Sequence, residues 1–302
     1  MNFIGKGNGR FDFTGFSGKL GAISLGLCLG NLTFSKDMST TASTTTFTIR
    51  ADGNKQLTLK TNGQILDFPI NFAGTITATN TVFPPSITLL DDLTLGPTNG
   101  NLTISTYCNF DANVYNITCV TATISTLANY TVKFGKGIWT VTGATFTMSG
   151  SAVSTINAGS AIIRMTSSSA KTFTTPSSAN PLPALCQAGS GALTITGTAG
   201  TFNDIFASVF PSTISLGGSY SCNNFTLSGR PGALVTLNST VAATGRILTK
   251  VGGGTVSCNF LSIQDSTPSG GNWYAGPDST RVSNFGIWSA SQAPNSNMMD
   301  IV

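Results

Sequence analysis

The chain repeats a short phrase of six residues. The phrase Cys-Asn-Asn-Phe-Thr-Leu at residues 222–227 returns 36 residues later as Cys-Asn-Phe-Leu-Ser-Ile at 258–263. Similar phrases start at residues 202–205 and 108–111, and the second half alone recurs at 31–34, 101–104 and 116–119. Self-similarity of this kind predicts a repeat architecture, in which each unit buries its apolar side against the next.

Apolar and polar residues alternate in short segments along the whole chain. Gly, Asn, Ser and Pro clusters separate these segments, and no stripe of helical spacing is present. Charged residues make up 9% of the chain, and every acidic residue is Asp. Because Glu favours exposed helices, its absence fits an all-β chain. The clearest strands are predicted at residues 46–49, 56–59, 74–79, 138–142, 145–148, 161–165, 192–196 and 233–237.

The repeats favour an irregular right-handed parallel β-helix, or β-solenoid, in which each coil lays its strands on those of the coil before. With about 20 to 30 residues per coil, we expect about 10 to 15 coils and a rod of about 50 to 70 Å, at roughly 4.8 Å per strand spacing. The alternative is a multi-sheet β-sandwich, since a chain rich in Thr and Ser also produces echoes by chance.

Four parts of the chain are predicted from these patterns. They are an N-terminal β segment for attachment or capping (1–60), the solenoid body (61–257), a C-terminal capping segment (258–288) and a tail (289–302). Two proline-rich stretches, Pro84-Pro85 and Thr175–Pro183, mark loops or changes in the cross-section of the rod, because proline cannot donate within a strand ladder.

The composition excludes several classes of function. The chain has no His, which excludes Ser-His-Asp and Cys-His catalysis and His-ligated metal sites. The formal charge of +4 is scattered, so we expect no nucleic-acid partner. No run is long and apolar enough for a membrane helix, and no export signal is apparent. We expect no metal and no cofactor.

Cysteine usage favours free thiols over disulfides. The even number of six is weak evidence for bridges in a chain of 302 residues, and no zinc-like spacing is present. Several of the cysteines lie within apolar strands, where buried thiols are common. They are Cys28, Cys108, Cys119, Cys186, Cys222 and Cys258.

Carboxylates are the remaining candidates for catalysis. Asp91 and Asp92 are adjacent, but neighbours in a strand point to opposite faces, so a turn before residues 93–95 is the favoured interpretation. Asp111, Asp204 and Asp265 each lie in or just after a repeated phrase. Stacked in successive coils they would bind a cation such as calcium, although bonds to their own turns are the simpler explanation.

Four aromatic residues are candidates for glycan binding: Trp139, Trp273, Tyr274 and Trp288. Flat rings can stack on the apolar faces of sugars. The alternative for Trp273 and Trp288 is that they cover the open end of the core. Gly252–Gly254 is predicted to be a turn and not a phosphate loop. The six Asn-x-Ser/Thr sequons are attributed to chance; they begin at Asn31, Asn101, Asn116, Asn129, Asn224 and Asn238.

Residues 258–288 run from Cys-Asn-Phe-Leu-Ser-Ile-Gln-Asp-Ser through Asn-Trp-Tyr-Ala-Gly to Phe-Gly-Ile-Trp. This stretch resembles the closing segment of a family of β-rich repeat proteins of environmental bacteriophages. Residues 191–205, 232–239, 137–143 and 154–159 resemble the family as well, whereas 284–286 depart from its Asn-rich turn. The resemblance implies a virion protein of the tail-fibre, spike or capsid-surface type, without a cofactor.

Three functions follow as hypotheses. The first is a non-enzymatic virion structural protein that contacts other virion proteins, forms a homo-oligomer such as a trimer and adheres to a host-surface glycan. It would assemble in the bacterial cytoplasm and reside on the virion, or be extracellular. The second is a polysaccharide depolymerase on a β-helix, and the third is a cellular surface fibril or adhesin that polymerises.

Overall fold

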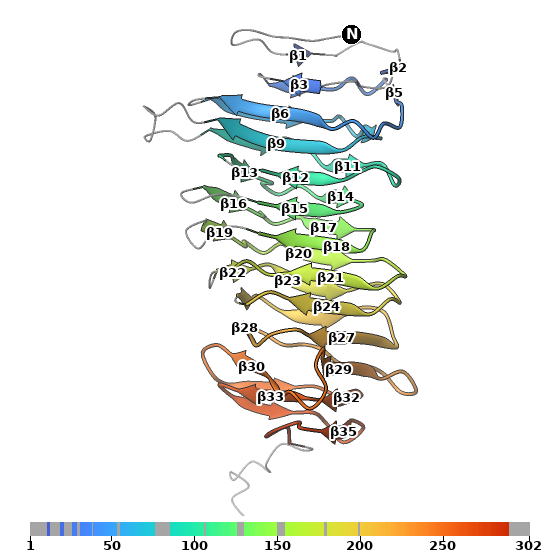
Figure 1. Cartoon of the computed structure of the whole chain (residues 1–302), viewed down its shortest axis with the longest axis vertical. Coiled ribbons are helices and arrows are strands. Elements are labelled where there is room, and N and C mark those ends of the chain that lie inside the picture. The colour runs from blue at the N-terminus through green and yellow to red at the C-terminus, as the bar shows by residue number, and fades with distance from the viewer. Residues whose placement is uncertain are drawn as a thin grey trace, which may run out of the picture.

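The protein is a stack of β-strand coils. The computed structural model describes residues 11–12, 19–20, 26–28, 31–37, 39–52, 55–75, 85–105, 107–125, 130–149, 155–177, 180–198 and 200–289. Over these residues the chain forms a parallel β-solenoid of about 10 turns without helices (Figure 1). The predicted β-solenoid is confirmed, with the number of coils at the lower end of the expected range. The alternative β-sandwich is wrong, because every pairing between named strands is parallel, whereas sandwiches pair their strands antiparallel.

A full coil contributes one strand to each of three sheets. Sheet 1 has seven strands, β1 (Phe11–Asp12), β4 (Leu32–Thr33), β7 (Gln56–Lys60), β10 (Ser86–Leu89), β13 (Asn109–Asp111), β16 (Thr131–Lys133) and β19 (Thr155–Asn157). Sheet 2 has seven as well, β8 (Ile65–Leu66), β11 (Leu93–Leu95), β14 (Ile117–Cys119), β17 (Ile138–Val141), β20 (Ile162–Met165), β23 (Ala184–Gln187) and β26 (Ile205–Ala207).

Sheet 3 runs the length of the rod. Its twelve strands are β3 (Gly26–Cys28), β6 (Phe47–Asp52), β9 (Ile70–Thr75), β12 (Leu102–Ile104), β15 (Ala122–Ile124), β18 (Thr145–Met148), β21 (Lys171–Thr174), β24 (Leu193–Thr196), β27 (Ser212–Leu216), β29 (Val235–Ser239), β32 (Leu261–Gln264) and β35 (Thr280–Ser283). Three shorter sheets complete the coils. Sheet 4 has five strands, β22 (Pro181–Leu182), β25 (Thr201–Phe202), β28 (Tyr220–Cys222), β30 (Arg246–Lys250) and β33 (Ser266–Ser269). The other two sheets have two strands each: β2 (Lys19–Leu20) pairs with β5 (Ser39–Thr40), and β31 (Thr255–Ser257) pairs with β34 (Asn272–Tyr274).

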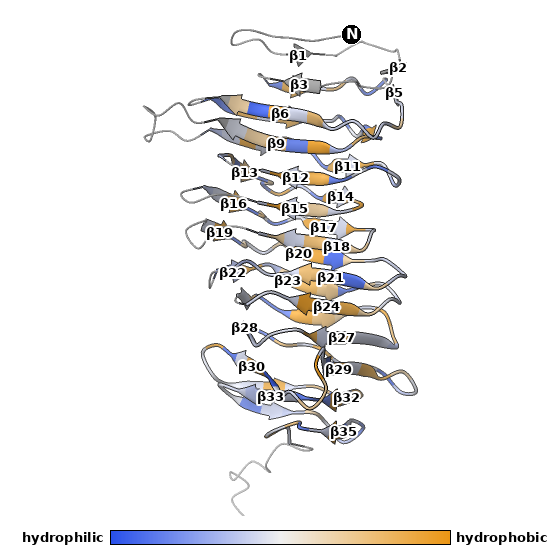
Figure 2. Ribbon diagram, in the orientation of Figure 1, coloured by the Kyte–Doolittle hydropathy of each residue, from blue (hydrophilic) through white to orange (hydrophobic). Residues whose placement is uncertain are grey.

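The core fills the inside of the stack. Inward residues alternate with outward ones along most strands, as in β12 and β14. The hydropathy colours change from residue to residue along β6 and β9 in Figure 2. Because the strands are in register, one apolar residue lies on the next from coil to coil. Phe146 of β18 and Phe173 of β21 are register partners, and their stacked ring centres lie 5.2 Å apart. Across the core, Phe72 of sheet 3 and Phe110 of sheet 1 also stack, with ring centres 5.0 Å apart. The alternation in the sequence therefore becomes a set of continuous apolar ladders.

Three copies of the Asn-x-Thr phrase mark the start of a strand, each in a different sheet, whereas the copy at 224–226 starts no strand. Asn31 lies at β4 in sheet 1, Asn116 at β14 in sheet 2 and Asn101 at β12 in sheet 3. Each accepts a hydrogen bond on Oδ1 from the following coil, from the backbone of Thr58 and Ile138 and from the hydroxyl of Thr121 respectively. The phrase is thus a clasp between coils, and not the marker of one position in the coil.

The two copies of the longest phrase occupy different corners of the solenoid. Cys222 ends β28 in sheet 4, whereas Cys258 follows β31. Asn259, next to Cys258, bonds through its backbone to Ser228, which is 31 residues earlier. In the coil that precedes Cys258, the residue at the corresponding position is therefore Leu227 and not Cys222. The spacing of 36 residues does not measure one coil.

The proline-rich stretch at 175–183 interrupts one sheet only. Sheet 1 ends at β19 and sheet 4 begins at β22 with Pro181, while sheets 2 and 3 continue through β20–β23 and β21–β24. This fits the missing donor of proline. Pro84 lies outside the described residues. Among the described residues between 31 and 60, β4, β6 and β7 belong to sheets 1 and 3, which continue through the body, whereas β5 pairs with β2. Residues 290–302 of the tail lie outside the described part.

Five cysteines are buried free thiols: Cys108, Cys119, Cys186, Cys222 and Cys258. The predicted reduced state is confirmed for these five, and the side chain of Cys28 lies outside the described part. Burial raises the thiol pKa to about 12 at four of them, Cys108, Cys119, Cys222 and Cys258. These thiols remain protonated at neutral pH and are poor nucleophiles.

Candidate functional site

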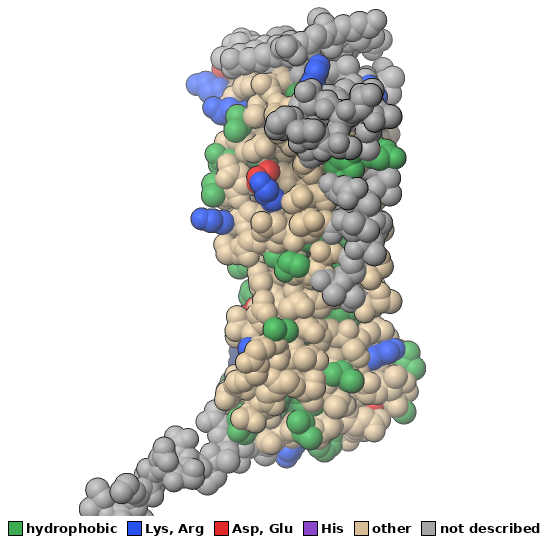
Figure 3. Space-filling view, turned by 90° about the vertical axis from the view of Figure 1, so that its left-hand side faces the viewer, with side chains coloured by type: hydrophobic (Ala, Val, Ile, Leu, Met, Phe, Trp, Pro, Cys, Tyr) green, Lys and Arg blue, Asp and Glu red, His purple; other side chains and the backbone are tan. Residues whose placement is uncertain are grey.

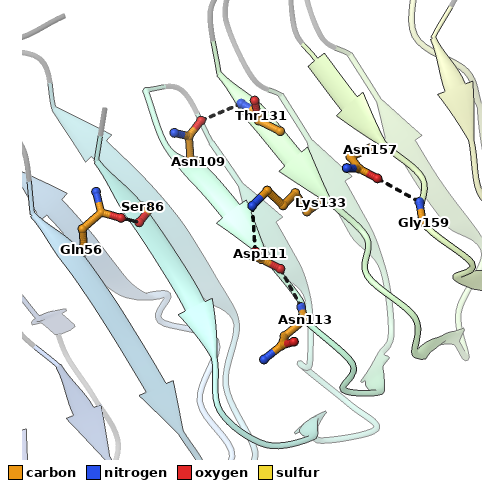
Figure 4. Close-up of polar contacts among 9 residues, drawn as sticks. All are labelled: Gln56, Ser86, Asn109, Asp111, Asn113, Thr131, Lys133, Asn157 and Gly159. Atoms are coloured by element: carbon orange, nitrogen blue, oxygen red, sulfur yellow. Dashed lines mark hydrogen bonds and ion pairs between the residues drawn. The ribbon is translucent and has the colours of Figure 1, made fainter. Parts of the chain in front are cut away.

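The outward face of sheet 1 carries the richest set of polar side chains, which we call the polar face (Figure 4). Strands β10, β13, β16 and β19 each place polar side chains outward at two positions, and β7 does so at two matching positions and at Lys60. The parallel register aligns these positions in two columns. The columns are Gln56, Ser86, Asn109, Thr131 and Thr155, and Thr58, Thr88, Asp111, Lys133 and Asn157.

Contacts between coils fix the side chains of the polar face. Asn109 Oδ1 accepts the backbone N–H of Thr131 at 2.6 Å. The Asp111 carboxylate accepts from Lys133 Nζ at 3.1 Å and from the backbone N–H of Asn113 at 2.8 Å. These bonds hold the amide and the ion pair in place before any ligand arrives. Less ordering entropy is then lost on binding.

Several donors of the polar face stay available to a ligand. The side chain of Lys133 is 52% exposed and that of Asp111 30%. Within the described part of the chain, Nδ2 of Asn109 and Nδ2 of Asn157 donate to no protein acceptor. Figure 3 shows that this side of the rod has few charged groups. The arrangement offers amides, hydroxyls and one ammonium to a ligand rich in hydroxyl groups.

A glycine closes one end of the polar face. The Gly159 backbone N–H donates to Asn157 Oδ1 at 3.1 Å, and the residue has φ of +57°. A Cβ at this position would lie 2.0 Å from the carbonyl oxygen of Gly135 in the coil below. Only glycine therefore permits the close approach of the two corners.

Three of the four predicted glycan-binding aromatic residues lie inside the rod. Trp139 is 0% exposed, and Trp273 and Trp288 are 2% exposed. Each indole N–H donates to a backbone carbonyl, of Phe134, Ser269 and Ser266 respectively. Their rings present no face to a sugar in this structure. Tyr274 alone of the four is partly exposed.

Trp273 and Trp288 close the C-terminal end of the core. Their ring centres lie 5.0 Å apart, edge to face, and both contact Phe225. Ser289 bridges to Tyr274 and donates its N–H to the Trp273 carbonyl, so the last residues fold back across the end. Trp273 and Trp288 thus cover the open end of the core, which was the alternative to glycan binding for these two residues.

The adjacent carboxylates Asp91 and Asp92 point in opposite directions along the rod. Asp91 accepts hydrogen bonds from the backbone of Thr61 and Asn62, in the preceding coil. Asp92 accepts from the backbone and side-chain amide of Asn116, in the next coil. The pair therefore joins three coils before β11, as the turn interpretation predicted, and does not converge on one bond.

Asp111, Asp204 and Asp265 do not stack, so the alternative of a cation-binding column of carboxylates is wrong. Asp111 lies in sheet 1, Asp204 between β25 and β26, and Asp265 between β32 and β33. The described residues contain no group of three or more acidic or Cys side chains suited to a metal ion. The reason is the clasp role of the phrases: they start strands on different sides of the rod, so residues next to them are not superimposed.

Asp204 joins two coils near the C-terminal end of the body. Its carboxylate accepts the backbone N–H of Thr226 at 3.0 Å and the Thr226 hydroxyl at 2.7 Å. Burial raises the pKa of this carboxyl above its ordinary value, and the bonds from Thr226 and Ile205 oppose the shift. Asp204 therefore links two coils, and burial of its charged carboxylate costs desolvation free energy.

The sequence pointed to the aromatic residues and missed the polar face. A signal was present, since Asn109 and Asp111, Thr131 and Lys133, and Thr155 and Asn157 each stand two residues apart in a strand. Period two places each pair on one face. Which pairs lie beside each other depends on coil length, and contacts between neighbouring coils join residues 18 to 33 positions apart.

The described residues include no helix of the length and hydrophobicity that a membrane span requires. No protein-family model, curated protein or solved structure matches the chain.

Proposed function

We propose that the protein is a non-enzymatic structural rod of a bacteriophage virion, in which the polar face adheres to a host-surface glycan. The observation that supports it most is the continuous stack of about 10 coils. A solenoid of this length holds surface groups at fixed positions over a long distance, as a fibre, spike or capsid decoration requires.

The polar surface supports a role outside the cell. The exposed strand positions carry mainly Thr, Ser and Asn, and some of these side chains, such as those of Asn109 and Asn116, accept hydrogen bonds from the neighbouring coil. Charged residues are only 9% of the chain. Such a surface offers few sites for nonspecific electrostatic adhesion. The virion setting itself rests on the resemblance of residues 258–288 to bacteriophage proteins.

The polar face supports the choice of a glycan as partner. Sugars present hydroxyl groups that amides, carboxylates and ammonium groups bind, and Asn109, Asp111, Lys133 and Asn157 provide them on one flat surface. This moves the proposed contact from the buried tryptophans to sheet 1. We propose further that the rod contacts other virion proteins and forms a homo-oligomer, with a trimer as the expected state in sedimentation equilibrium.

The location is tested on native particles. Antibodies against the purified chain are applied to particles from infected host cells, with immunogold electron microscopy and mass spectrometry of the gradient-purified virions. We expect labels on the particle surface and the chain in the virion fraction. Label confined to filaments of uninfected cells would replace the proposal by the cellular fibril, and its absence from both would refute the virion role.

The adhesion is tested by binding to polysaccharide from the host surface. We expect the double variant Asn109→Ala/Lys133→Ala to lose at least tenfold in affinity. A matched double variant, Thr118→Ala/Thr140→Ala, changes outward residues of β14 and β17 on sheet 2 and should bind as the wild type does. Equal loss in both variants, or no binding by the wild type, would refute adhesion through the polar face. Release of reducing sugar would indicate a depolymerase instead.

A further inference from the structure

The outward face of sheet 3 carries a two-dimensional array of threonines, which we call the threonine array. Neighbouring strands repeat the pattern Thr-x-Thr, and their register places the first and second threonines of each pair in two straight columns. In the pair at β12, the first position is occupied by Asn101 and not by a threonine. The array consists of Thr103, Thr121, Thr123, Thr145, Thr147, Thr172, Thr174, Thr194 and Thr196.

The geometry of the sheet sets both repeats of the array. Successive coils are about 4.8 Å apart, and two threonines separated by one residue in a strand are about 6.7 Å apart. The branched side chain of threonine is stiff at χ1, which favours a uniform presentation of the hydroxyl and the methyl group. Figure 1 shows β12, β15, β18, β21 and β24 stacked above one another in this region.

The core holds the array rigid from beneath. The residue between the two threonines of each pair points inward and is buried, as at Ala122, Phe146, Phe173 and Ile195. The stacked rings of Phe146 and Phe173, with centres 5.2 Å apart, lie under the middle pairs. Close packing of this kind leaves little freedom to the strands above it.

Most hydroxyls of the array have no hydrogen-bond partner among the residues that the structure describes. Six of them form no side-chain hydrogen bond within the described chain, at Thr103, Thr123, Thr145, Thr147, Thr172 and Thr194. The other bonds run along the columns, from Thr121 to Asn101 at 2.7 Å and between Thr174 and Thr196 at 3.0 Å. The free hydroxyls can order water or bind a surface.

The chemistry of the array differs from that of the polar face. The outward positions of β12, β15, β18, β21, β24 and β27 hold Thr and Ser, without a charged group or an aromatic ring. A glycan site would gain from amides and rings, and an anionic partner would need basic groups. A regular set of uncharged methyl and hydroxyl groups fits an uncharged crystal surface whose own groups donate and accept hydrogen bonds at regular intervals.

We propose that the threonine array binds ice. The two repeats of the array are close to those of the oxygen atoms on a prism face of ordinary ice, so hydroxyls and the water ordered between the methyl groups can join the crystal lattice. The rod is long enough to present several adjacent coils to one crystal plane. This activity is independent of the virion proposal and uses a different face of the rod.

The test measures ice growth with the purified full chain. We expect thermal hysteresis, with faceted crystals, and inhibition of recrystallisation in a frozen sucrose solution. Thr147→Tyr places a ring in the centre of the array and should reduce the hysteresis at least fivefold. The matched control Thr140→Tyr adds the same ring to an outward position of β17 on sheet 2 and should leave the hysteresis unchanged. Thr147→Val replaces the hydroxyl with a second methyl group and keeps the shape of the side chain, and should lose less than Thr147→Tyr.

Circular dichroism and thermal unfolding of each variant separate loss of binding from loss of fold. Absence of hysteresis and of recrystallisation inhibition in the folded wild type would overturn the proposal. Equal loss in Thr140→Tyr and Thr147→Tyr would overturn it as well. Sedimentation that shows a dimer in the wild type and a monomer in Thr147→Tyr, without ice activity, would assign the array to contact between copies instead.

Discussion

The coils in the middle of the rod and those at its C-terminal end are held together by different kinds of contact. In the middle, from β10 to β27, each coil supplies three strands, and similar bonds recur from coil to coil. After β28 the side that sheet 2 occupied has no strand until β31. Four non-glycine residues of the end have positive φ, against two, Tyr107 and Asn113, in the described residues from β10 to β27; the four are Ala243, Phe260, Asp265 and Asn284. Many similar contacts between coils therefore stabilise the middle, whereas a few particular residues stabilise the end.

Asp265 illustrates the difference. This buried carboxylate, 1% exposed, accepts the backbone N–H of Ala243 at 3.1 Å and the side-chain amide of Asn284 at 2.7 Å. It thereby joins three successive corners that all have left-handed backbone conformation. In the middle of the rod, Asn116 makes one of many similar clasps. The end of a solenoid has no further coil to supply bonds, so it needs such special contacts.

The largest expected effect comes from the buried tryptophans. We expect Trp139→Ala to lower the free energy of unfolding by about 3–5 kcal/mol, because it leaves a large cavity in the middle of the stack. Trp288→Ala removes a similar area but lies at the end, so fraying should stay within residues 258–289. Chemical denaturation gives the first value, and hydrogen exchange followed by mass spectrometry shows where protection is lost.

Trp139→Phe and Trp288→Phe serve as controls that keep most of the apolar volume, and both should cost less than the alanine variants. Loss of protection over the whole rod in Trp288→Ala would contradict the distinction between the end and the middle.

Asp265→Ala should have the next largest effect, about 2–3 kcal/mol. The variant leaves the N–H of Ala243 and the amide of Asn284 without their carboxyl acceptor in a buried corner. It also loses a residue type that tolerates positive φ. Asp265→Asn keeps one acceptor oxygen and should cost less. A loss in Asp265→Ala no greater than that in Asp111→Ala would show that the end depends on its corners no more than the middle does.

The pH dependence at Asp204 tests the junction between the two regions. Because burial raises the carboxyl pKa above its ordinary value of 3.8, the folded state binds more protons than the unfolded state between these two pKa values. The contribution of Asp204 to stability therefore falls as pH rises through this range and stays low above it. Asp204→Asn removes the change.

We expect the stability of Asp204→Asn relative to the wild type to increase from pH 3 to pH 7, as measured by urea denaturation at each pH. Thr118→Val on sheet 2 provides the control, since it changes no titratable group. A difference that decreases over the same range would mean that the bonds from Thr226 outweigh desolvation and lower the pKa.

The smallest effect is expected on the polar face. Lys133→Ala removes the exposed ion pair with Asp111 and should change the free energy of unfolding by less than about 1 kcal/mol. Addition of salt should weaken the wild type by a similarly small amount. A loss above 2 kcal/mol would show that the polar face holds the coils together, and that its side chains are not mainly available for a ligand.

The sequence predicted the local chemistry of the fold better than its arrangement. Alternation at residues 145–148 and 192–196 predicted strands that match β18 and β24 within one residue. The site was predicted less well, since a Trp in an alternating strand, such as Trp139, fits a buried or an exposed face equally. The polar face needs the register of β13 on β16, which residues far apart in the sequence determine.

By itself the sequence determined an all-β chain with a repeated phrase and favoured buried free thiols, because period-two alternation, the absence of Glu and the position of cysteines within apolar strands are local properties. Only the tertiary structure decided which side chains share a face. Coils of unequal length place Asp111, Asp204 and Asp265 on different sides, yet align Thr145, Thr172 and Thr194 in one column. The pairing of strands between coils sets this alignment, and it depends on the packing of the whole stack.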